Sequence, residues 1–313
     1  MNAGPVSAGP VSAGLAGVYC ALVTPLDGSG ALDDAGLERL ADRVVRGGVA
    51  GVCPAGSTGE GMRLSAEQRI SLLRRVRALV PPGLTVIPSP SSTHPPATAE
   101  EIWAFAGEGA DAVLVAPPAS YRLADDDLFR FYDTLAEQSP LPIVMYHIPD
   151  LMGVGVPAKV AARLAGHPRI IGLKDSSRQF EYTEEVLYAT AGTGFSVLTG
   201  SDTMLVATLL HGGTGAIAAS ANLVPDLGCA VYRAAARQDW EEAGRLQERL
   251  FHVVAAVRQA GGAAPGWKAA LGLAGVCSPQ PAPPAGPVTG PALDRLRERL
   301  AELEVLPAGT PAG

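Results

Sequence analysis

The chain has 313 residues, of which 47% are hydrophobic and 18% charged, so it can fill a sizeable core, and disorder is excluded as its main state. Its formal net charge is −7, and no basic block exceeds the pair Arg74-Arg75, which argues against a nucleic-acid partner. No apolar stretch approaches the roughly 18 residues of a membrane helix, so no membrane partner is expected.

The N-terminal segment, residues 1–14, contains the direct repeat AGPVSAGPVSAG without a periodic apolar face. This composition predicts a disordered tail. The segment also lacks the basic and apolar regions of a secretory signal, so we expect a cytoplasmic location. Four cysteines lie far apart in the chain, which predicts buried thiols rather than a zinc knuckle or a disulfide framework; they are Cys20, Cys53, Cys229 and Cys277.

After the tail, short β-branched and apolar runs alternate with stretches of helical period, as in βαβ units. The runs start roughly every 28 residues, close to the ~30 residues of one βαβ unit. Eight even units predict a (β/α)8 TIM barrel over residues 15–224 rather than a doubly wound sheet. The predicted strands begin near Val18, Val49, Leu84, Asp111, Pro142, Ile170, Phe195 and Thr214.

Start signals identify several of the helices between these strands. Asp33-Asp34 opens a helix that runs to Arg46, and Ser65 with Gln68 forms a capping box for a helix that ends near Val80. Asp125 to Asp127 open another, which ends near Gln138.

From residue 225 onward the pattern is helical, which predicts a C-terminal helical extension over 225–305 and a flexible tail over 306–313. The proline-rich and alanine-rich stretch 277–290 is predicted to be an extended linker. The helices expected in the extension cover residues 226–237, 240–259, 266–273 and 291–303.

A lysine at the end of the sixth predicted strand is the sharpest chemical signal, because active sites of such barrels lie at the C-terminal ends of strands. In the run IIGLKD, strand alternation puts Ile170, Gly172 and Lys174 on one face. Burial disfavours the charged form of an amine, so Lys174 could attack a ketone to form a Schiff base. The alternative is a strand-end lysine in an ion pair with a loop carboxylate such as Asp175.

Two other strand ends carry polar groups. Tyr146 ends the fifth strand, where a phenol near an amine can relay protons. The loop after the second strand reads GSTGE over 56–60, and its backbone N–H groups and two hydroxyls suit an anion such as a carboxylate. The five histidines have no metal-ligand spacing, so no metal is expected.

Together, GSTGE at 56–60, YHIP at 146–149 and GLKD at 172–175 resemble the N-acetylneuraminate lyase and dihydrodipicolinate synthase family, over about residues 17–303. The resemblance implies a (β/α)8 barrel with C-terminal helices. It also implies class I Schiff-base chemistry on pyruvate or another 2-keto acid, with no cofactor. The family is usually homotetrameric, so a homo-oligomer, dimer or tetramer, is expected.

The resemblance also assigns roles to residues. Lys174 resembles the Schiff-base lysine and Tyr146 the proton-relaying tyrosine. Ser57 and Thr58, followed by Gly59, resemble the residues that bind the carboxylate of the keto acid, and Thr58 is assigned to the proton relay as well. In the sugar-acid lyases, the segment that holds Gly200 and Asp202 touches the hydroxylated tail of the substrate. Tyr121 resembles a tyrosine that lends its hydroxyl at a dimer interface.

Departures from the family pattern bear on the substrate. Dihydrodipicolinate synthases usually carry an arginine shortly after YNxP that holds the carboxylate of the semialdehyde, whereas this chain has Asp150-Leu151-Met152-Gly153. The YHIP run is more similar to sialic acid lyases. Those lyases usually have a glutamate and a serine where this chain has Thr203 and Ala219. The Gly200-Ser201-Asp202 triplet is similar to 2-keto-3-deoxygluconate aldolases.

We therefore expect a carbon–carbon lyase or aldolase that cleaves or forms a bond in a small 2-keto acid through an imine on Lys174, with a pyruvate-type donor and a sugar-acid-like substrate. The first alternative is a dihydrodipicolinate synthase or a keto-acid dehydratase, which is a hydro-lyase, on the same imine. An alternative of another class is a non-catalytic barrel that binds a sugar acid and regulates a partner.

Overall fold

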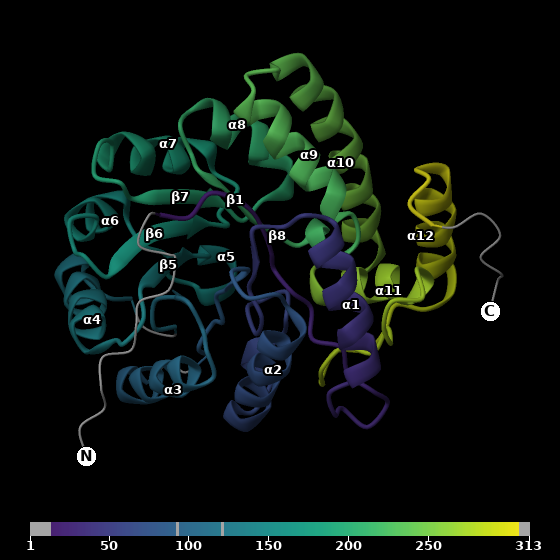
Figure 1. The fold of residues 1–313 in the computed structure, drawn as a ribbon, viewed down its shortest axis with the longest axis horizontal. Helices are drawn as coiled ribbons and strands as arrows, with labels where there is room; N and C mark the ends of the chain where they lie inside the picture. Colours follow the sequence, from purple (N-terminus) through teal and green to yellow (C-terminus); the bar gives the residue numbers. More distant parts are fainter. Residues whose placement is uncertain (1–13, 92–93, 120–121, 307–313) are drawn as a thin grey trace.

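A ring of eight parallel strands forms the centre of the computed structural model, which describes residues 14–91, 94–119 and 122–306 (Figure 1). All eight strands expected from the sequence are confirmed, and the fold is a (β/α)8 TIM barrel with C-terminal helices. The strands are β1 (Gly17–Cys20), β2 (Gly51–Val52), β3 (Thr85–Val86), β4 (Val113–Val115), β5 (Ile143–His147), β6 (Ile170–Asp175), β7 (Ser196–Thr199) and β8 (Gly215–Ala218).

Backbone hydrogen bonds close the ring. The ladder order runs β3-β2-β1-β8-β7-β6-β5-β4. The two ends of this order are joined because the Leu114 N–H donates to the Pro88 carbonyl at 3.0 Å and the Asp111 N–H to the Val86 carbonyl at 2.9 Å. A closed ring brings all eight C-terminal strand ends to one rim, where side chains from distant parts of the chain can converge.

Helices follow the strands and pack around the ring. The predicted caps are present: the Asp33 side chain accepts from the Gly36 N–H, and Ser65 with Gln68 forms the capping box. The helices are α1 (Asp34–Arg46), α2 (Ala66–Leu79), α3 (Pro95–Gly107), α4 (Asp125–Gln138), α5 (Pro149–Met152), α6 (Ala158–Leu164), α7 (Phe180–Ala189), α8 (Leu205–Leu210), α9 (Pro225–Ala236), α10 (Trp240–Gly261), α11 (Ala264–Leu273) and α12 (Gly290–Glu302), with 3-10 turns η2 (Gly61–Arg63), η3 (Asp202–Met204) and η4 (Ser220–Asn222).

Strand alternation divides the apolar side chains between the barrel interior and the layer beneath the helices. On β5, Val144 and Tyr146 belong to the interior cluster and Met145 to the outer one. On β6, the expectation that Ile170 shares a face with Lys174 is wrong. Ile170 packs in the outer cluster and Ile171 against the interior one, because the β5–β6 register shifts between Ile143 and Val144.

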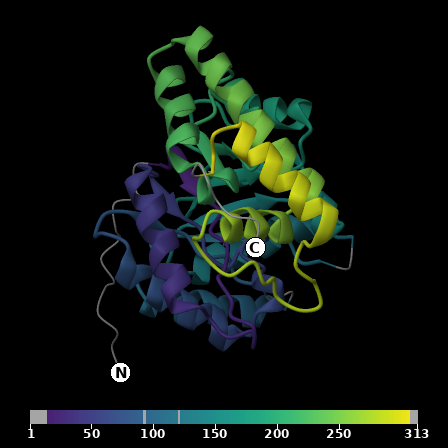
Figure 2. The same ribbon diagram turned by 90° about the vertical axis from the view of Figure 1, so that its right-hand side faces the viewer.

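The C-terminal helices continue directly from the barrel. Helix α9 packs on β1 between α1 and α8, and α10 packs along α9. Helix α12 crosses α10 and α11 (Figure 2). The predicted limits of the tail, barrel and extension stay predictions. Within the described residues, none of the helices combines the length and the apolar character needed to cross a membrane.

The four cysteines are all in the described part of the chain, and each is free and buried, as expected.

Candidate active site

Lys174 and Tyr146 lie side by side at the rim of the barrel. They are partners in the register between β5 and β6, and both are buried, with exposed fractions of 4% and 3%. The Lys174 Nζ lies 4.3 Å from the centroid of the Tyr146 ring. The expected convergence of amine and phenol is therefore present in the structure.

The alternative interpretation of Lys174, an ion pair with Asp175, is wrong. The two carboxylate oxygens of Asp175 accept from the Ser177 N–H at 2.8 Å and from the Thr183 hydroxyl at 2.6 Å. Among the described residues, Lys174 has no carboxylate within ion-pair distance. Its amine therefore faces the ring of Tyr146 and no counter-charge, and no ion pair holds it away from a ketone bound at the rim.

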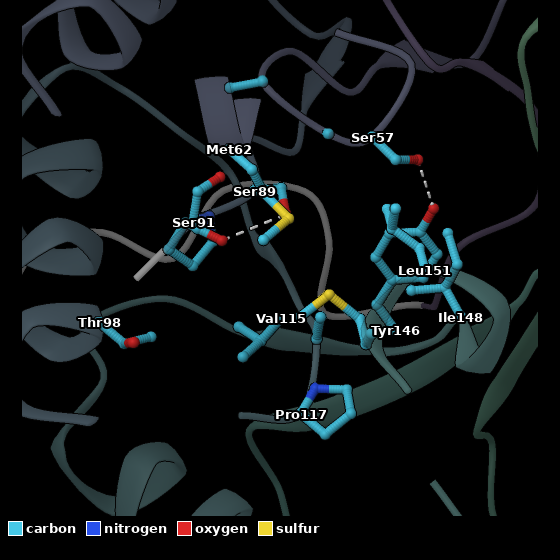
Figure 3. Close-up of a pocket in the computed structure, with 15 residues that line it drawn as sticks. Ser57, Met62, Ser89, Ser91, Thr98, Val115, Pro117, Tyr146, Ile148 and Leu151 are labelled. Atoms are coloured by element: carbon cyan, nitrogen blue, oxygen red, sulfur yellow. Dashed lines mark hydrogen bonds between the residues drawn. The ribbon is translucent and has the colours of Figure 1, made fainter. Parts of the chain in front are cut away.

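A serine hydroxyl from the GSTGE loop completes the contact with the phenol. The Ser57 Oγ and the Tyr146 hydroxyl oxygen lie 2.8 Å apart (Figure 3). The resemblance assigned the proton relay to Thr58, but the hydroxyl that contacts Tyr146 belongs to Ser57. Thr58 is buried in the same loop, with 9% of its surface exposed.

The GSTGE loop is tightly wound. Ala55 and Glu60 adopt left-handed conformations with φ of 58° and 57°, which non-glycine residues rarely adopt and which cluster at functional sites. The Gly59 carbonyl accepts from the Thr24 hydroxyl at 2.6 Å. A side chain at position 59 would lie only 2.6 Å from the Leu22 carbonyl oxygen, so glycine is required there for packing.

A buried ion pair ties this loop to the C-terminal extension, and the sequence analysis did not find it. The Lys268 Nζ lies 2.6 Å from the Glu60 Oε1, and both side chains are within 1% of full burial. The same amine donates to the Gln280 carbonyl, and the Glu60 Oε2 accepts from the Ala282 N–H, each at 2.8 Å. Burial lowers the pKa of Lys268, and Glu60 acts in the opposite direction. A lone lysine in the apolar helix α11 is the signal that could have predicted a buried partner.

The two residues expected at the seventh strand end have packing roles. A side chain at Gly200 would lie 2.8 Å from the Lys174 Cε, so this glycine makes room for the lysine. The Asp202 Oδ1 accepts from the Ser220 N–H at 2.8 Å, and the Asp202 carbonyl accepts from the Gln247 side chain at 2.9 Å. These contacts do not show whether Gly200 or Asp202 touches a substrate, so their role in substrate binding stays a prediction. Tyr121 lies outside the described residues.

A cysteine inside the barrel is not a competing nucleophile. Burial raises the pKa of the Cys53 thiol to about 12, although the nearby Lys174 acts in the opposite direction. The thiolate is the reactive form, so a thiol with this pKa is inert near neutral pH.

A pocket opens beside Tyr146, at the C-terminal ends of β2 to β5. Ser57, Ser89 and Tyr146 lie in its wall, together with mostly apolar side chains (Figure 3). A mostly apolar lining with a few polar groups is typical of small-molecule sites. Across the described part of the chain, no three histidine, cysteine, aspartate or glutamate side chains gather to form a metal site, and the absence of a metal stays a prediction.

The chain is similar to known proteins along most of its length. Residues 14–303 match the dihydrodipicolinate synthetase family. The chain is 34% identical to 4-hydroxy-tetrahydrodipicolinate synthase 1 of Streptomyces coelicolor over 287 residues, which cover 91% of this chain and 90% of that protein. It is also 34% identical to the 4-hydroxy-tetrahydrodipicolinate synthase of Haloarcula marismortui, over 75% of this chain and 76% of that one.

Two solved structures are similar along nearly their whole length. YagE from E. coli K12, a prophage protein of the dihydrodipicolinic acid synthase family solved in complex with pyruvate, superposes with a TM-score of 0.89. The identity is 28%, with 93% of this chain and 99% of YagE covered. Dihydrodipicolinate synthase from Bacteroides thetaiotaomicron gives a TM-score of 0.87 at 32% identity, with 92% and 98% covered.

Removing the cation of the buried pair should destabilise the protein strongly. Lys268→Met removes the buried counter-charge of the Glu60 carboxylate and leaves it only the partly exposed Arg63 at 3.2 Å, which costs about 3–5 kcal/mol of unfolding free energy. The double variant Glu60→Gln/Lys268→Met should recover part of that loss. Urea unfolding measures both. Lys159→Met, which breaks an exposed pair with Asp125, is the control and should cost less than about 1 kcal/mol. Equal losses of unfolding free energy in Lys268→Met and Lys159→Met would contradict the assignment of Lys268 to a buried ion pair.

His147, next to Tyr146, should make stability depend on pH. Burial lowers the pKa of His147, against a smaller opposite effect of Asp175; its Nδ1 accepts from the Val156 N–H at 2.9 Å. The unfolded chain binds this proton near pH 6.5, and the folded chain only at lower pH. Stability should therefore fall as the pH drops from about 6.5 towards the lowered folded value. The urea midpoint should depend less on pH in His147→Gln than in the wild type. In the control His252→Gln, which changes an exposed histidine, its pH dependence should equal that of the wild type.

Proposed function

The chain belongs to the dihydrodipicolinate synthetase family, and on that premise we propose that it condenses pyruvate with an aldehyde through a Schiff base on Lys174. Membership makes it a carbon–carbon lyase of the class I aldolase type. One observation carries the proposal: a buried lysine without a counter-charge lies against the ring of a tyrosine that contacts a second hydroxyl. The structure of YagE with pyruvate supports pyruvate as the keto acid.

The first half of the reaction forms the imine. The neutral Lys174 amine attacks the C2 ketone, and the resulting carbinolamine loses water to give a protonated imine. Tyr146 supplies the proton that leaves with the hydroxide, and Ser57, 2.8 Å away, relays a replacement proton to it. The backbone N–H groups of the GSTGE loop and the Thr58 hydroxyl hold the carboxylate of the keto acid.

The second half forms the carbon–carbon bond. The proton lost from C3 passes through Ser57 to the Tyr146 oxygen and is the replacement proton; its loss turns the imine into an enamine, with the iminium nitrogen as electron sink. The enamine C3 attacks the carbonyl carbon of the aldehyde, whose oxygen takes a proton from Tyr146. Water then hydrolyses the imine, which releases the product and the free amine. The water lost in the first half returns here, so the cycle needs no metal or cofactor.

The names of the relatives favour synthesis over cleavage. Both curated proteins described above are called synthases, which supports the dihydrodipicolinate synthase alternative better than our main expectation of a lyase for sugar acids. A homo-oligomer and a cytoplasmic location remain part of the proposal.

Borohydride reduction in the presence of pyruvate should fix one adduct on the peptide that holds Lys174. The chain has only three lysines, so mass spectrometry of the digest assigns the site without ambiguity. Lys174→Arg should abolish the adduct, and Lys159→Arg should leave it unchanged. A protein that shows a thermal shift with pyruvate but no adduct would support the non-catalytic, regulatory barrel instead.

Ser57 and Thr58 should have different kinetic effects. Ser57→Ala removes the hydroxyl that contacts Tyr146 and should lower kcat roughly tenfold, while Tyr146→Phe should lower it by about 10²-fold or more. Thr58→Val keeps the shape of the side chain and should mainly raise the KM for pyruvate. Steady-state rates of pyruvate consumption measure both parameters. A larger fall in kcat for Thr58→Val than for Ser57→Ala would return the relay to Thr58.

A further inference from the structure

The pocket beside Tyr146 is where the second substrate must lie if the proposed function holds. It opens along the ends of β2 to β5, on the side of Tyr146 whose hydroxyl meets Ser57. An aldehyde in this pocket would present its carbonyl to that hydroxyl and its substituent to the rest of the wall. The chemistry of the wall therefore selects the substituent.

The described wall of the pocket is mostly apolar, and its polar side chains are the hydroxyls of Ser57, Ser89, Ser91, Thr98 and Tyr146. Its larger apolar side chains are Met62, Val115, Pro117, Ile148, Leu151 and Met152, and all of them except Met152 are labelled in Figure 3. Tyr146 is the only titratable side chain among the described residues that line it. The hydroxyl of Ser89, another lining residue, already donates to the Leu114 carbonyl at 2.7 Å.

Two of these apolar side chains are unusually exposed. Met62 is 52% and Leu151 55% exposed, although both border a site rather than an open surface. Helix α5 brings Leu151 there: Pro149 begins the helix directly after β5, and Gly153, with φ of 71°, ends it. Exposed apolar side chains around a concave site indicate an apolar ligand that covers them.

None of the described residues that line this pocket is a cation that could bind a second carboxylate. Arg69 is buried and holds both oxygens of Glu101. Arg63 is paired with Glu60 at 3.2 Å. Arg122 lies in a separate cavity, which shares only Pro117 with the pocket among the described lining residues. A carboxylate that loses its water without a cation or donors is strongly disfavoured.

We propose that the acceptor is an aldehyde with an uncharged, apolar substituent, either branched aliphatic or aromatic, and not a carboxylated semialdehyde. The inference rests on the proposed function and names the substrate class of the same site. The enamine C3 of the pyruvate adduct bonds to the aldehyde carbon, the aldehyde oxygen gains a proton from Tyr146, and hydrolysis of the imine releases a 4-hydroxy-2-keto acid. Leu151 determines specificity, because α5 places its largely exposed apolar side chain in the wall of this pocket.

The test compares acceptors at fixed pyruvate. Pyruvate consumption and product mass are measured with 3-methylbutanal and benzaldehyde, and with succinate semialdehyde and aspartate semialdehyde. We expect kcat/KM for the better apolar aldehyde to exceed that for either semialdehyde by at least about tenfold. Leu151→Arg should reverse the preference. Leu210→Arg is the matched control, because Leu210 is equally exposed at 57% but lies on α8 outside the pocket, and it should keep the wild-type preference.

The outcomes separate the two proposals. Preference of the wild type for a semialdehyde overturns the acceptor proposal, and loss of that preference in Arg122→Ala would then identify the cation that binds the carboxylate. Borohydride trapping of the pyruvate imine without turnover of either apolar aldehyde also overturns it, and leaves the Schiff-base chemistry standing. Failure to trap pyruvate on Lys174 overturns the proposed function itself.

Discussion

Burying an ammonium group without a counter-charge is costly. Of the two buried lysines of this chain, one has a carboxylate partner and the other does not. Lys268 is fully buried against Glu60, whereas Lys174 faces the ring of Tyr146. The residues around Lys174 maintain this difference: Asp175 is directed to Ser177 and Thr183, and Gly200 leaves room for the lysine side chain. The amine of Lys174 is thus left without an ion-pair partner, so it can react with a ketone to form a Schiff base.

The loop that holds Ser57 connects the two parts of the molecule. Its glutamate, Glu60, binds Lys268 on α11 and the backbone of Ala282, so the C-terminal extension holds the loop from outside the barrel. The same loop presents Ser57 to Tyr146 at the rim. The extension therefore acts as a support for the site, and the barrel supplies the reactive groups from β5 and β6.

Local patterns in the sequence predicted most of the architecture. Alternating apolar runs located all eight strands, and the caps at Asp33 and Ser65 located two helix starts, because each signal depends on neighbouring residues only. The same patterns failed at Ile170, where a register shift that depends on β5 moves the side chain to the outer face. The family resemblance identified the loop hydroxyls and assigned Thr58 to the proton relay, which stays a prediction, whereas the contact with Tyr146 is made by Ser57.

The sequence by itself determined which chemical groups stand at which strand ends, because strand periodicity and turn residues are read over a few positions. It thereby placed a lysine, a tyrosine and a hydroxyl-rich loop on one rim. Only the tertiary structure decided which of them touch. Ser57 and Tyr146 are 89 positions apart and Glu60 and Ala282 are 222 apart, so their contacts depend on ring closure and on the packing of α11. The apolar wall of the pocket, assembled from four strand ends, was likewise decided by the fold.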